Sequence, residues 1–577
     1  MNHDIQSAEQ LFTDVLVIGS GGAALRAALE AHKAGAEVLI VVKGQHQKSG
    51  ATYYSVAEIG AFNVPDGAAD PNDQPEHYYN DIQNAALGMS DPRLSRILAS
   101  EAQAAMRDLE NYGVVFEKED DHYLAFQACF SSKPRTHVIK NHFKPIVHAL
   151  GSQVTKENIR YIERCMITDL IVRDGQCFGA FAIDQNGKFL VIRAKATILA
   201  TGGASQLFAK NLYPPDITGD GYAMAYRAGA QLVNMEFMQA GISLLNPVNL
   251  FNSYMWEAFP RVTDRDGLPF IANYLPDGVT EEEVMKTKAR HFPFSTRDHS
   301  RYLEISIQSE INKGHGTANG GVYLDYLQTD FAKILQDKKS DIGKMWSLAY
   351  DWYLRRNVDL YKDRLEITCS AHAINGGVRI NEDAHSSVIG LFAAGEVAGG
   401  PHGADRLGGN MAVTCQVFGS RAGKAAARFS REIGGHREMK PALNAHQEFI
   451  YRIRHQRGVL KIGDLKKRLQ ESANRNLLII RSEESLRQLN ELIYELEDSL
   501  LSQNCSVESA KDLVRAIELK NLLDAGRMIS NAALARKESR GGHYRTDFPT
   551  LDPNLSQNII IDANRPEGCF FAKLAEL

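Results

Sequence analysis

The residues that first suggest a chemical role form a glycine-rich turn near the start of the chain, Gly19-Ser-Gly21-Gly22-Ala23. A continuous apolar run at 15–18 precedes the turn, as in a strand buried on both faces, and apolar residues at helical spacing follow it. Gly19 permits the sharp turn, and Gly21 lets the backbone approach a pyrophosphate at the positive end of the following helix. An ordinary tight turn is the alternative. The flanking strand and helix favour a dinucleotide-binding unit.

A second apolar run, 37–42, follows at the distance expected for the next parallel strand. An acidic residue at the end of that strand usually binds the ribose of NAD, but Lys43 stands there. The cofactor is therefore not NAD, or its ribose is bound from elsewhere. The next run, 49–60, is rich in small and hydroxylated residues, including Ser49 and Thr52. It suits backbone packed against a flat ligand, although a plain loop explains it equally well.

Four later stretches place small residues beside a predicted strand or helix. A strand at 196–200 ends in Thr201-Gly202-Gly203, and a strand at 389–394 ends in Gly395-Glu396. Between them, 218–221 (Thr-Gly-Asp-Gly) precedes a helix, where Asp220 either caps the helix or orients a ligand. A glycine-rich loop, 401–410, leads into another predicted helix at 412–426.

Length and composition limit the number of domains and the classes of function that the chain can have. The 577 residues can form two to four domains. A net charge of −5 argues against a face that binds nucleic acid. Seven scattered cysteines without a Cys-x-x-Cys pair predict no cysteine-bound cluster or zinc site in this chain and suggest a reducing, cytoplasmic setting. The polar N-terminus argues against a leader, and the absence of a long apolar run argues against a transmembrane segment.

The remaining strands and helices are predicted from the periodicity of apolar residues. Alternation between 161 and 200 predicts three strands joined by Asp174-Gly175 and Asn186-Gly187, with 196–200 as a separate strand. Helices are predicted at 98–112, 222–228 and 297–312, and throughout the region from 440 onward. The polar connector 135–137 is interpreted as a surface loop.

Together these motifs resemble the flavoprotein subunit of succinate dehydrogenase and fumarate reductase, with L-aspartate oxidase and adenylylsulfate reductase as relatives. The matching segments appear in the family's order: 19–23, 200–203, 218–221, 235–237, 395–396, 402–410 and 536–543. The resemblance implies an α/β fold in which a Rossmann-like FAD-binding domain (1–239 and 355–435) is interrupted by an α+β capping domain (240–354). A C-terminal helical domain (436–545) and a tail (546–577) follow.

The resemblance also implies FAD as the cofactor, with Glu396 on its ribose. The expected cofactor-binding residues are Gly19, Gly21, Gly22, Ala23, Lys43, Ser49, Thr52, Thr201, Gly202, Gly203, Asp220, Glu396 and Asn410. Members with covalent FAD carry a histidine directly after the serine that corresponds to Ser49. Here Gly50 and Ala51 follow, and His46 lies outside the motif. Non-covalent FAD is therefore expected.

In this family, hydride moves between flavin N5 and a carbon beside a substrate carboxylate, and a proton moves at the neighbouring carbon. His372 and Arg406 match the carboxylate-binding residues, and Arg297 matches the arginine that transfers the proton. Glu257 and Arg261 match a proton relay, although their spacing is one residue longer than the family's Glu-x-x-Arg. A small carboxylic acid is thus the expected substrate.

Two positions depart from the fumarate-type pattern. Gly241 stands where a histidine binds the second carboxylate, and Trp256 replaces a threonine that assists it. These changes predict a monocarboxylate with a less polar far end rather than fumarate. The competing readings are an amino acid oxidase like L-aspartate oxidase and an electron-transfer flavoprotein subunit without its own substrate. An iron–sulfur or ferredoxin-like protein is a possible partner.

Overall fold

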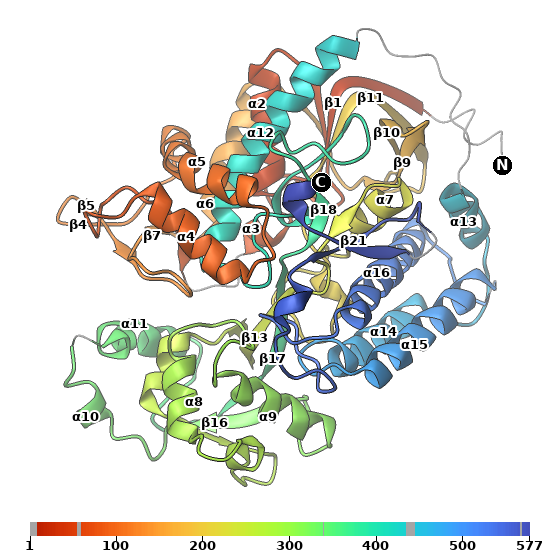
Figure 1. Cartoon of the computed structure of the whole chain (residues 1–577). Coiled ribbons are helices and arrows are strands. Elements are labelled where there is room, and N and C mark those ends of the chain that lie inside the picture. The colour runs from red at the N-terminus through yellow and green to blue at the C-terminus, as the bar shows by residue number, and fades with distance from the viewer. Residues whose placement is uncertain (1–8, 55–58, 339, 434–444, 503, 566–567) are drawn as a thin grey trace.

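The computed structural model describes residues 9–54, 59–338, 340–433, 445–502, 504–565 and 568–577. Figure 1 shows a large α/β body, a smaller body below it and a group of helices beside both. We call the smaller body, which contains α8–α11, the cap. Part of the run 49–60 after the second strand (55–58) and part of the tail (566–567) lie outside the described residues.

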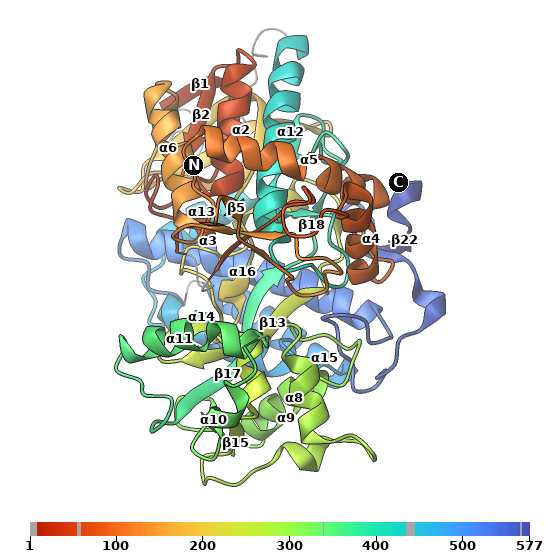
Figure 2. The ribbon, with the colours of Figure 1, turned by 90° about the vertical axis from the view of Figure 1, so that its left-hand side faces the viewer.

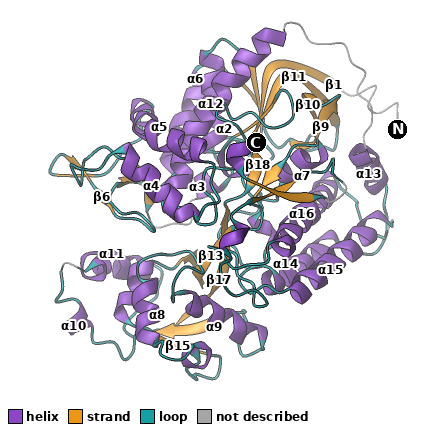
Figure 3. Cartoon of the chain, viewed as in Figure 1, coloured by secondary structure: helices purple, strands orange, loops and turns teal. Residues whose placement is uncertain are grey.

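The α/β body is organised around a seven-stranded sheet of order β8-β2-β1-β11-β10-β9, in which β19 also pairs with β11. Its strands are β1 (Glu9–Ile18), β2 (Val38–Val41), β8 (Arg160–Ile162), β9 (Met166–Arg173), β10 (Gln176–Ile183), β11 (Phe189–Leu199) and β19 (Leu391–Ala393). β1 pairs in parallel with β2 and β11, which confirms the predicted βαβ unit. In Figure 3 these strands lie together with helices alongside.

The helix after the glycine turn packs closely against a helix from far along the sequence. α2 (Gly22–Lys33) lies beside α12 (Asn410–Ile433). A Cβ atom added at Gly423 would lie 2.2 Å from the Ala27 carbonyl oxygen. Small residues are therefore needed where these helices meet, and this contact brings the 401–410 loop beside the N-terminal strands.

The remaining helices of the α/β body and the helical region lie around this core. They are α3 (Ala51–Tyr54), α4 (Pro75–Ala86), α5 (Pro92–Asn111), α6 (Lys144–Lys156), α7 (Asp220–Arg227), α13 (Ala445–Arg454), α14 (Ile462–Asn476), α15 (Glu483–Leu501) and α16 (Ala510–Ala535). Among the described residues, no helix combines the length and apolar character that crossing a membrane requires.

Three smaller sheets complete this body. A five-stranded sheet has the order β20-β18-β12-β21-β22. Its strands are β12 (Leu232–Val233), β18 (Gly377–Arg379), β20 (Ala398–Gly399), β21 (Asn558–Ile561) and β22 (Cys569–Ala572), so the C-terminal tail returns to the α/β body. The others contain β3 (Gly60–Asn63), β6 (Ala125–Phe126) and β7 (Thr136–Ile139), and the hairpin β4 (Lys118–Glu119) with β5 (His122–Tyr123).

The cap is built on a sheet of order β14-β13-β17-β16-β15. Its strands and helices are β13 (Met238–Leu245), β14 (Val248–Leu250), β15 (Arg261–Thr263), β16 (Val322–Asp325), β17 (Leu365–Ile374), α8 (Glu281–Lys288), α9 (Arg301–Asn312), α10 (Phe331–Ile334) and α11 (Asp341–Leu354). Figure 2 shows β13 and β17 running from the α/β body into the cap. β17 follows residue 354, so the cap sheet takes a strand from beyond the predicted boundary.

Two local predictions are wrong. The segments 189–191 and 196–200, predicted as separate strands, form the single strand β11. The predicted surface loop 135–137 is buried: Arg135 is 1% exposed, and its guanidinium pairs with Asp73 at 2.8 Å and also with Asp81. Buried charges are tolerated here because each has a partner.

Candidate active site

A large cavity lies between the glycine-rich turns and the cap. Its volume is about 1660 Å³, more than the roughly 300–1,000 Å³ of a typical small-molecule site. The wall includes many of the residues predicted from the sequence. They are Gly19, Gly21, Gly22, Ala23, Lys43, Ser49, Thr52, Thr201, Gly202, Asp220, Glu257, Glu396, His372 and Arg406. The cavity therefore joins the predicted cofactor region to the predicted substrate region.

The first two glycine motifs meet at one end of the cavity. Gly19 has a φ of +121°, and a Cβ atom there would lie 2.3 Å from the Ala200 carbonyl oxygen. Only glycine permits this approach, which joins the ends of β1 and β11. Gly21 caps α2 without a side-chain hydrogen bond, so the helix N-terminus faces the cavity with its backbone. Thr52 Oγ1 accepts a hydrogen bond of 3.3 Å from the Gly22 N–H.

These residues fit a pyrophosphate-containing cofactor. The hydroxyls of Ser20 and Thr201 are buried on the wall and have no hydrogen-bond partner among the described residues. Buried polar atoms are normally satisfied, so both hydroxyls are suited to bind a ligand. Together with the backbone N–H groups at the α2 N-terminus, they offer hydrogen-bond donors to such a cofactor.

Lys43 and Asp220 bind each other instead of standing free. Lys43 Nζ lies 2.8 Å from both Asp220 and Glu518, and 2.6 Å from the Thr218 hydroxyl. Burial lowers the pKa of Lys43, but the two carboxylates outweigh this and raise it. The pair lines the cavity and ties the α/β body to α16. Their contact with the cofactor stays a prediction.

Glu396 lies on the wall with a backbone donor already in place. Its Oε1 accepts a 3.0 Å hydrogen bond from the Ile374 N–H. A Cβ atom at Gly203 would lie 2.2 Å from the same oxygen, so this glycine makes room for the carboxylate. Burial raises the pKa of Glu396 to about 7, while the Ile374 amide and Arg406 oppose the shift. Gly203 and Asn410 are absent from the described wall; Asn410 accepts a 2.7 Å hydrogen bond from Tyr78 behind it.

His372 and Arg406 converge on the wall, from β17 and from the 401–410 loop. Gln239 Oε1 accepts two hydrogen bonds from the Arg406 guanidinium, from Nε at 3.0 Å and from Nη2 at 2.6 Å, which fixes its orientation. Burial, with a further contribution from Arg406, lowers the pKa of His372 to about 3. The imidazole is therefore neutral near pH 7. It can donate a hydrogen bond while Arg406 supplies the charge that a carboxylate needs.

Two aromatic rings flank His372 that sequence reasoning missed. The ring centres of Tyr213 and Phe292 lie 5.5 Å and 5.8 Å from that of His372, and both residues line the cavity. Neither position carries a recognisable motif. Their proximity arises from folding, which brings segments far apart in sequence to β17.

Phe292 also explains the surroundings of Gly241. A Cβ atom at Gly241 would lie 2.7 Å from the Phe292 ring, so Phe292 fills the space above this glycine. Trp256 differs from the expectation: it is fully buried, packs against Phe251 at 5.1 Å, and is absent from the described wall. Its indole contributes to the hydrophobic core of the cap, and Phe292 supplies the aromatic surface instead.

The predicted proton-transfer residues are not brought together. Glu257 lines the cavity, accepts a 3.1 Å hydrogen bond from the Ile342 N–H, and has its pKa raised by burial. Arg261 donates to the Gly267 carbonyl at 3.0 Å. Arg297 is absent from the described wall and forms an ion pair with Asp405 at 3.1 Å. Sequence reasoning did not single out Asp405.

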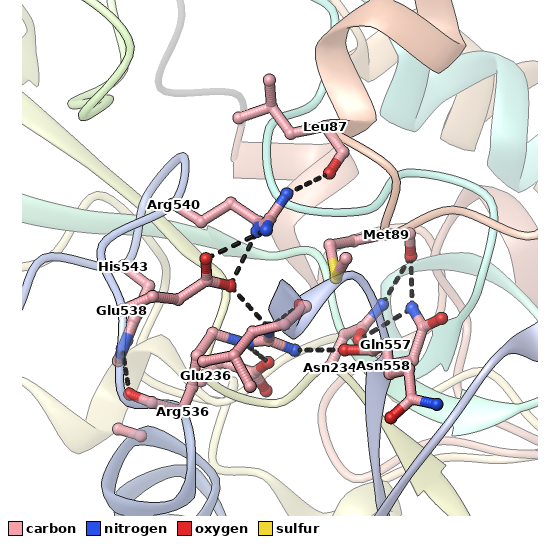
Figure 4. Close-up of polar contacts among 12 residues, drawn as sticks. Leu87, Met89, Asn234, Glu236, Arg536, Glu538, Arg540, His543, Gln557 and Asn558 are labelled. Carbon is pink, nitrogen blue, oxygen red and sulfur yellow. Dashed lines mark hydrogen bonds and ion pairs between the residues drawn. The ribbon is translucent and has the colours of Figure 1, made fainter. Parts of the chain in front are cut away.

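A buried ionic network supports this region from the C-terminal segment (Figure 4). Arg536 pairs with Glu236 and Glu538, and Glu538 also binds Arg540, which donates to the Leu87 carbonyl. The next residue, Gly541, accepts a 2.9 Å hydrogen bond from the Thr296 N–H. The network thereby holds the C-terminal segment against the residue that precedes Arg297.

Replacing Glu538 by alanine is expected to lower the melting temperature strongly. The substitution removes the shared partner of Arg536 and Arg540, and breaking a buried ion pair costs about 3–5 kcal/mol. Thermal unfolding followed by circular dichroism measures the effect. Glu483→Ala is the control, because it removes an exposed ion pair with Arg487 and should change little. Equal melting temperatures for the two variants would show that the network contributes no stability.

Comparison with known proteins agrees with this geometry. The FAD binding domain model matches residues 14–411, and the fumarate reductase flavoprotein C-terminal model matches 466–566. The chain is 33% identical to a subunit of the fumarate reductase (CoM/CoB) of Methanothermobacter marburgensis, over 95% of this chain and 97% of that protein. It is also 33% identical to an FAD-dependent oxidoreductase of Methanocaldococcus jannaschii, over 96% and 97%. Mycobacterium smegmatis Sdh1 has the same fold, with a TM-score of 0.82, 28% identity, and coverage of 98% and 94%.

The fold, the glycine-lined cavity and these matches define an FAD-dependent oxidoreductase. The chain belongs to the succinate dehydrogenase/fumarate reductase flavoprotein family. The predicted family, fold class and cofactor are thus confirmed. The roles of the individual site residues stay predictions.

Proposed function

We propose that this oxidoreductase acts on the carbon–carbon bond beside the carboxylate of a monocarboxylic acid whose far end is apolar. The observation that carries the proposal is the pairing on one wall of a carboxylate-binding group, His372 with Arg406, and an apolar ring, Phe292. FAD supplies the hydride chemistry when it is bound.

The chain contributes binding and charge. Arg406 neutralises the substrate carboxylate, and because Gln239 already holds its Nε and Nη2, the guanidinium is oriented in advance. His372 donates a hydrogen bond as a neutral imidazole. Such pre-organised donors lose little entropy when the substrate binds. Arg297 is the proposed proton donor at the neighbouring carbon.

A second carboxylate is disfavoured near Phe292. The cations that the cap adds to the described wall, Lys286, Arg290 and Lys344, are solvent-exposed. They face water and do not replace the missing histidine at Gly241. An unpaired buried charge costs at least several kcal/mol, whereas burying an apolar tail gains about 2 kcal/mol.

The test is a panel of acids assayed under anaerobic conditions with a reduced artificial donor. Unsaturated monocarboxylates with alkyl or aryl tails should be reduced with higher kcat/KM than fumarate. Oxygen consumption with peroxide release on an amino acid would instead identify an oxidase. Absence of turnover with every acid, with FAD bound, would favour an electron-transfer subunit without its own substrate.

We also propose that electrons are exchanged with a separate protein. The relative from Methanothermobacter marburgensis is named as one subunit of a larger enzyme, which supports a partner for this chain. An iron–sulfur or ferredoxin-like protein is the class that fits electron transfer to a flavin. Co-purification of a partner that reduces or reoxidises the flavin without free oxygen tests this.

The flavin is expected to leave the protein on acid precipitation. No histidine directly follows Ser49. His46 is absent from the described wall, and its ring stacks on the Tyr161 ring with the centroids 4.4 Å apart. Yellow colour and fluorescence should appear in the supernatant. Flavin fluorescence that stays with the denatured polypeptide on a gel would show a covalent link.

A further inference from the structure

Arg297 belongs to the cap, but its side-chain partners belong to the α/β body. Its guanidinium donates to Asp405 Oδ2 from Nε at 3.1 Å and to the Ala85 carbonyl from Nη2 at 3.1 Å, and it stacks over the Phe130 ring at 4.3 Å. Ala85 lies in α4, and Asp405 lies in the 401–410 loop. The side chain thus joins the two bodies of the molecule.

Asp405 is buried where the cap meets the α/β body, and it contacts two cap residues. Its side chain is 1% exposed, and Oδ2 also accepts a 2.7 Å hydrogen bond from the Ser295 hydroxyl of the cap. Oδ1 is buried without a partner among the described residues. With one oxygen unsatisfied, the carboxylate depends for its stability on the charge of Arg297. Asp405 directly precedes Arg406, the carboxylate-binding residue.

We propose that Asp405 is the positioning residue of Arg297, and that its ionised carboxylate fixes where the guanidinium lies relative to a substrate held by Arg406. This rests on the proposed function for its catalytic consequence. Asp405 thereby takes the role of anionic partner that the sequence resemblance gave to Glu257.

The contacts of the alternative partners support this assignment. Glu257 binds the Ile342 N–H, and Arg261 binds the Gly267 carbonyl, whereas Asp405 contacts Arg297 directly. Nε and Nη2 of Arg297 are used by the α/β body, and Nη1 has no hydrogen-bond partner among the described residues. Nη1 is therefore the nitrogen that remains for a reacting group.

Two partners of Arg297 are adjacent in sequence to residues of the cavity wall. Phe130 and Asp405, which hold it, directly follow and precede the wall residues Cys129 and Arg406. A small shift of the guanidinium therefore changes its distance from the substrate. A misplacement of about 1 Å can reduce turnover about 10²-fold.

The pH dependence follows from the surroundings of Asp405. Arg297, Ser295 and His291 face it from the cap, and His291 is paired with Asp298 at 3.0 Å. Burial raises the pKa of Asp405, while Arg297, Ser295 and His291 act in the opposite direction. Because the ion pair requires the carboxylate, turnover should fall as the pH falls through this raised pKa.

The test compares Asp405→Asn, Asp405→Glu and Ser295→Ala in the FAD-loaded protein. Asparagine keeps the shape and a hydrogen-bond acceptor but removes the charge. It should lower kcat by about 10²-fold with little change in KM, because His372 and Arg406 remain. Its acidic limb in the pH profile should disappear. Glutamate should restore part of kcat. Ser295→Ala removes two hydrogen bonds, to Asp405 and from the Arg297 N–H, but no charge, and should stay closer to the parent than Asp405→Asn.

A second measurement does not depend on turnover. Amide hydrogen exchange in 295–298 should rise about tenfold in Asp405→Asn, because the segment loses its ionic contact with the α/β body. If the parent reduces no acid, the proposed function fails while this measurement still tests the contact. Normal kcat in Asp405→Asn, an acidic limb that survives in it, or exchange unchanged from the parent would overturn the proposal. A greater loss of kcat in Glu257→Gln would return the role to Glu257.

Discussion

Arg297→Lys is expected to keep its FAD and lose nearly all turnover, by about 10²-fold or more. Arginine here uses Nε and Nη2 for two different acceptors, Asp405 and the Ala85 carbonyl, and stacks its flat face on Phe130. A lysine ammonium has no planar fork and cannot keep these contacts while offering a nitrogen to the substrate. FAD should remain bound because Arg297 is absent from the described cavity wall.

The measurement is kcat with a saturating unsaturated acid, together with the flavin absorbance of the same preparation. Arg265→Lys is the control, since Arg265 is an exposed cap arginine that pairs with Asp266 rather than with Asp405. Near-normal turnover in Arg297→Lys would remove Arg297 from proton transfer. Loss of both flavin and turnover would point to a folding defect instead.

The FAD-binding core could be predicted because its signals are local. The apolar run at 15–18, the turn at Gly19 and the helix after it are adjacent in sequence, and the structure places them as β1, the turn and α2. The hairpin at Asp174-Gly175 is likewise confirmed by pairing of Arg173 with Gln176. A short glycine dipeptide determines such a turn without help from the rest of the chain.

Predictions failed where tertiary contacts determine whether a residue is buried or exposed. Residues 135–137 resemble a surface loop because they contain charge, yet Arg135 is buried between Asp73 and Asp81, more than 50 positions away. Trp256 is assigned to the substrate pocket from a motif, but its indole is fully buried in the core of the cap. Large apolar side chains are more stable there than on an exposed cavity wall. Sequence spacing alone cannot distinguish these environments.

The candidate site divides in the same way. His372 and Arg406 could be located because motifs surround them, and both line the cavity. Phe292 and Asp405 lack such motifs, and each acts through a residue distant in sequence: Phe292 lies over Gly241, and Asp405 binds Arg297. Such long-range contacts depend on how the cap meets the α/β body, which a single sequence does not reveal.

Substrate preference is expected to change when Phe292 is exchanged for a carboxylate-binding group. The parent should favour an alkyl- or aryl-acrylate over fumarate, because the Phe292 ring contributes apolar surface worth about 2 kcal/mol, or about 30-fold in kcat/KM. Gly241→His alone should disrupt the site, since any side chain there meets the Phe292 ring. Phe292→Ala with Gly241→His removes the ring clash, leaves a tight 3.0 Å approach to the Phe292 carbonyl oxygen, and adds a donor for a second carboxylate.

The ratio of kcat/KM for fumarate to that for the acrylate should therefore rise at least about tenfold from the parent to the double variant. Phe292→Ala is the matched control: it should lose activity on the acrylate without gaining activity on fumarate. Trp256 should be left intact, because its indole is buried against Phe251 and a threonine there would open a cavity in the cap. A parent enzyme that already prefers fumarate would show that another donor binds the second carboxylate. Arg290, an exposed guanidinium on the wall, is then the side chain whose substitution should abolish that preference.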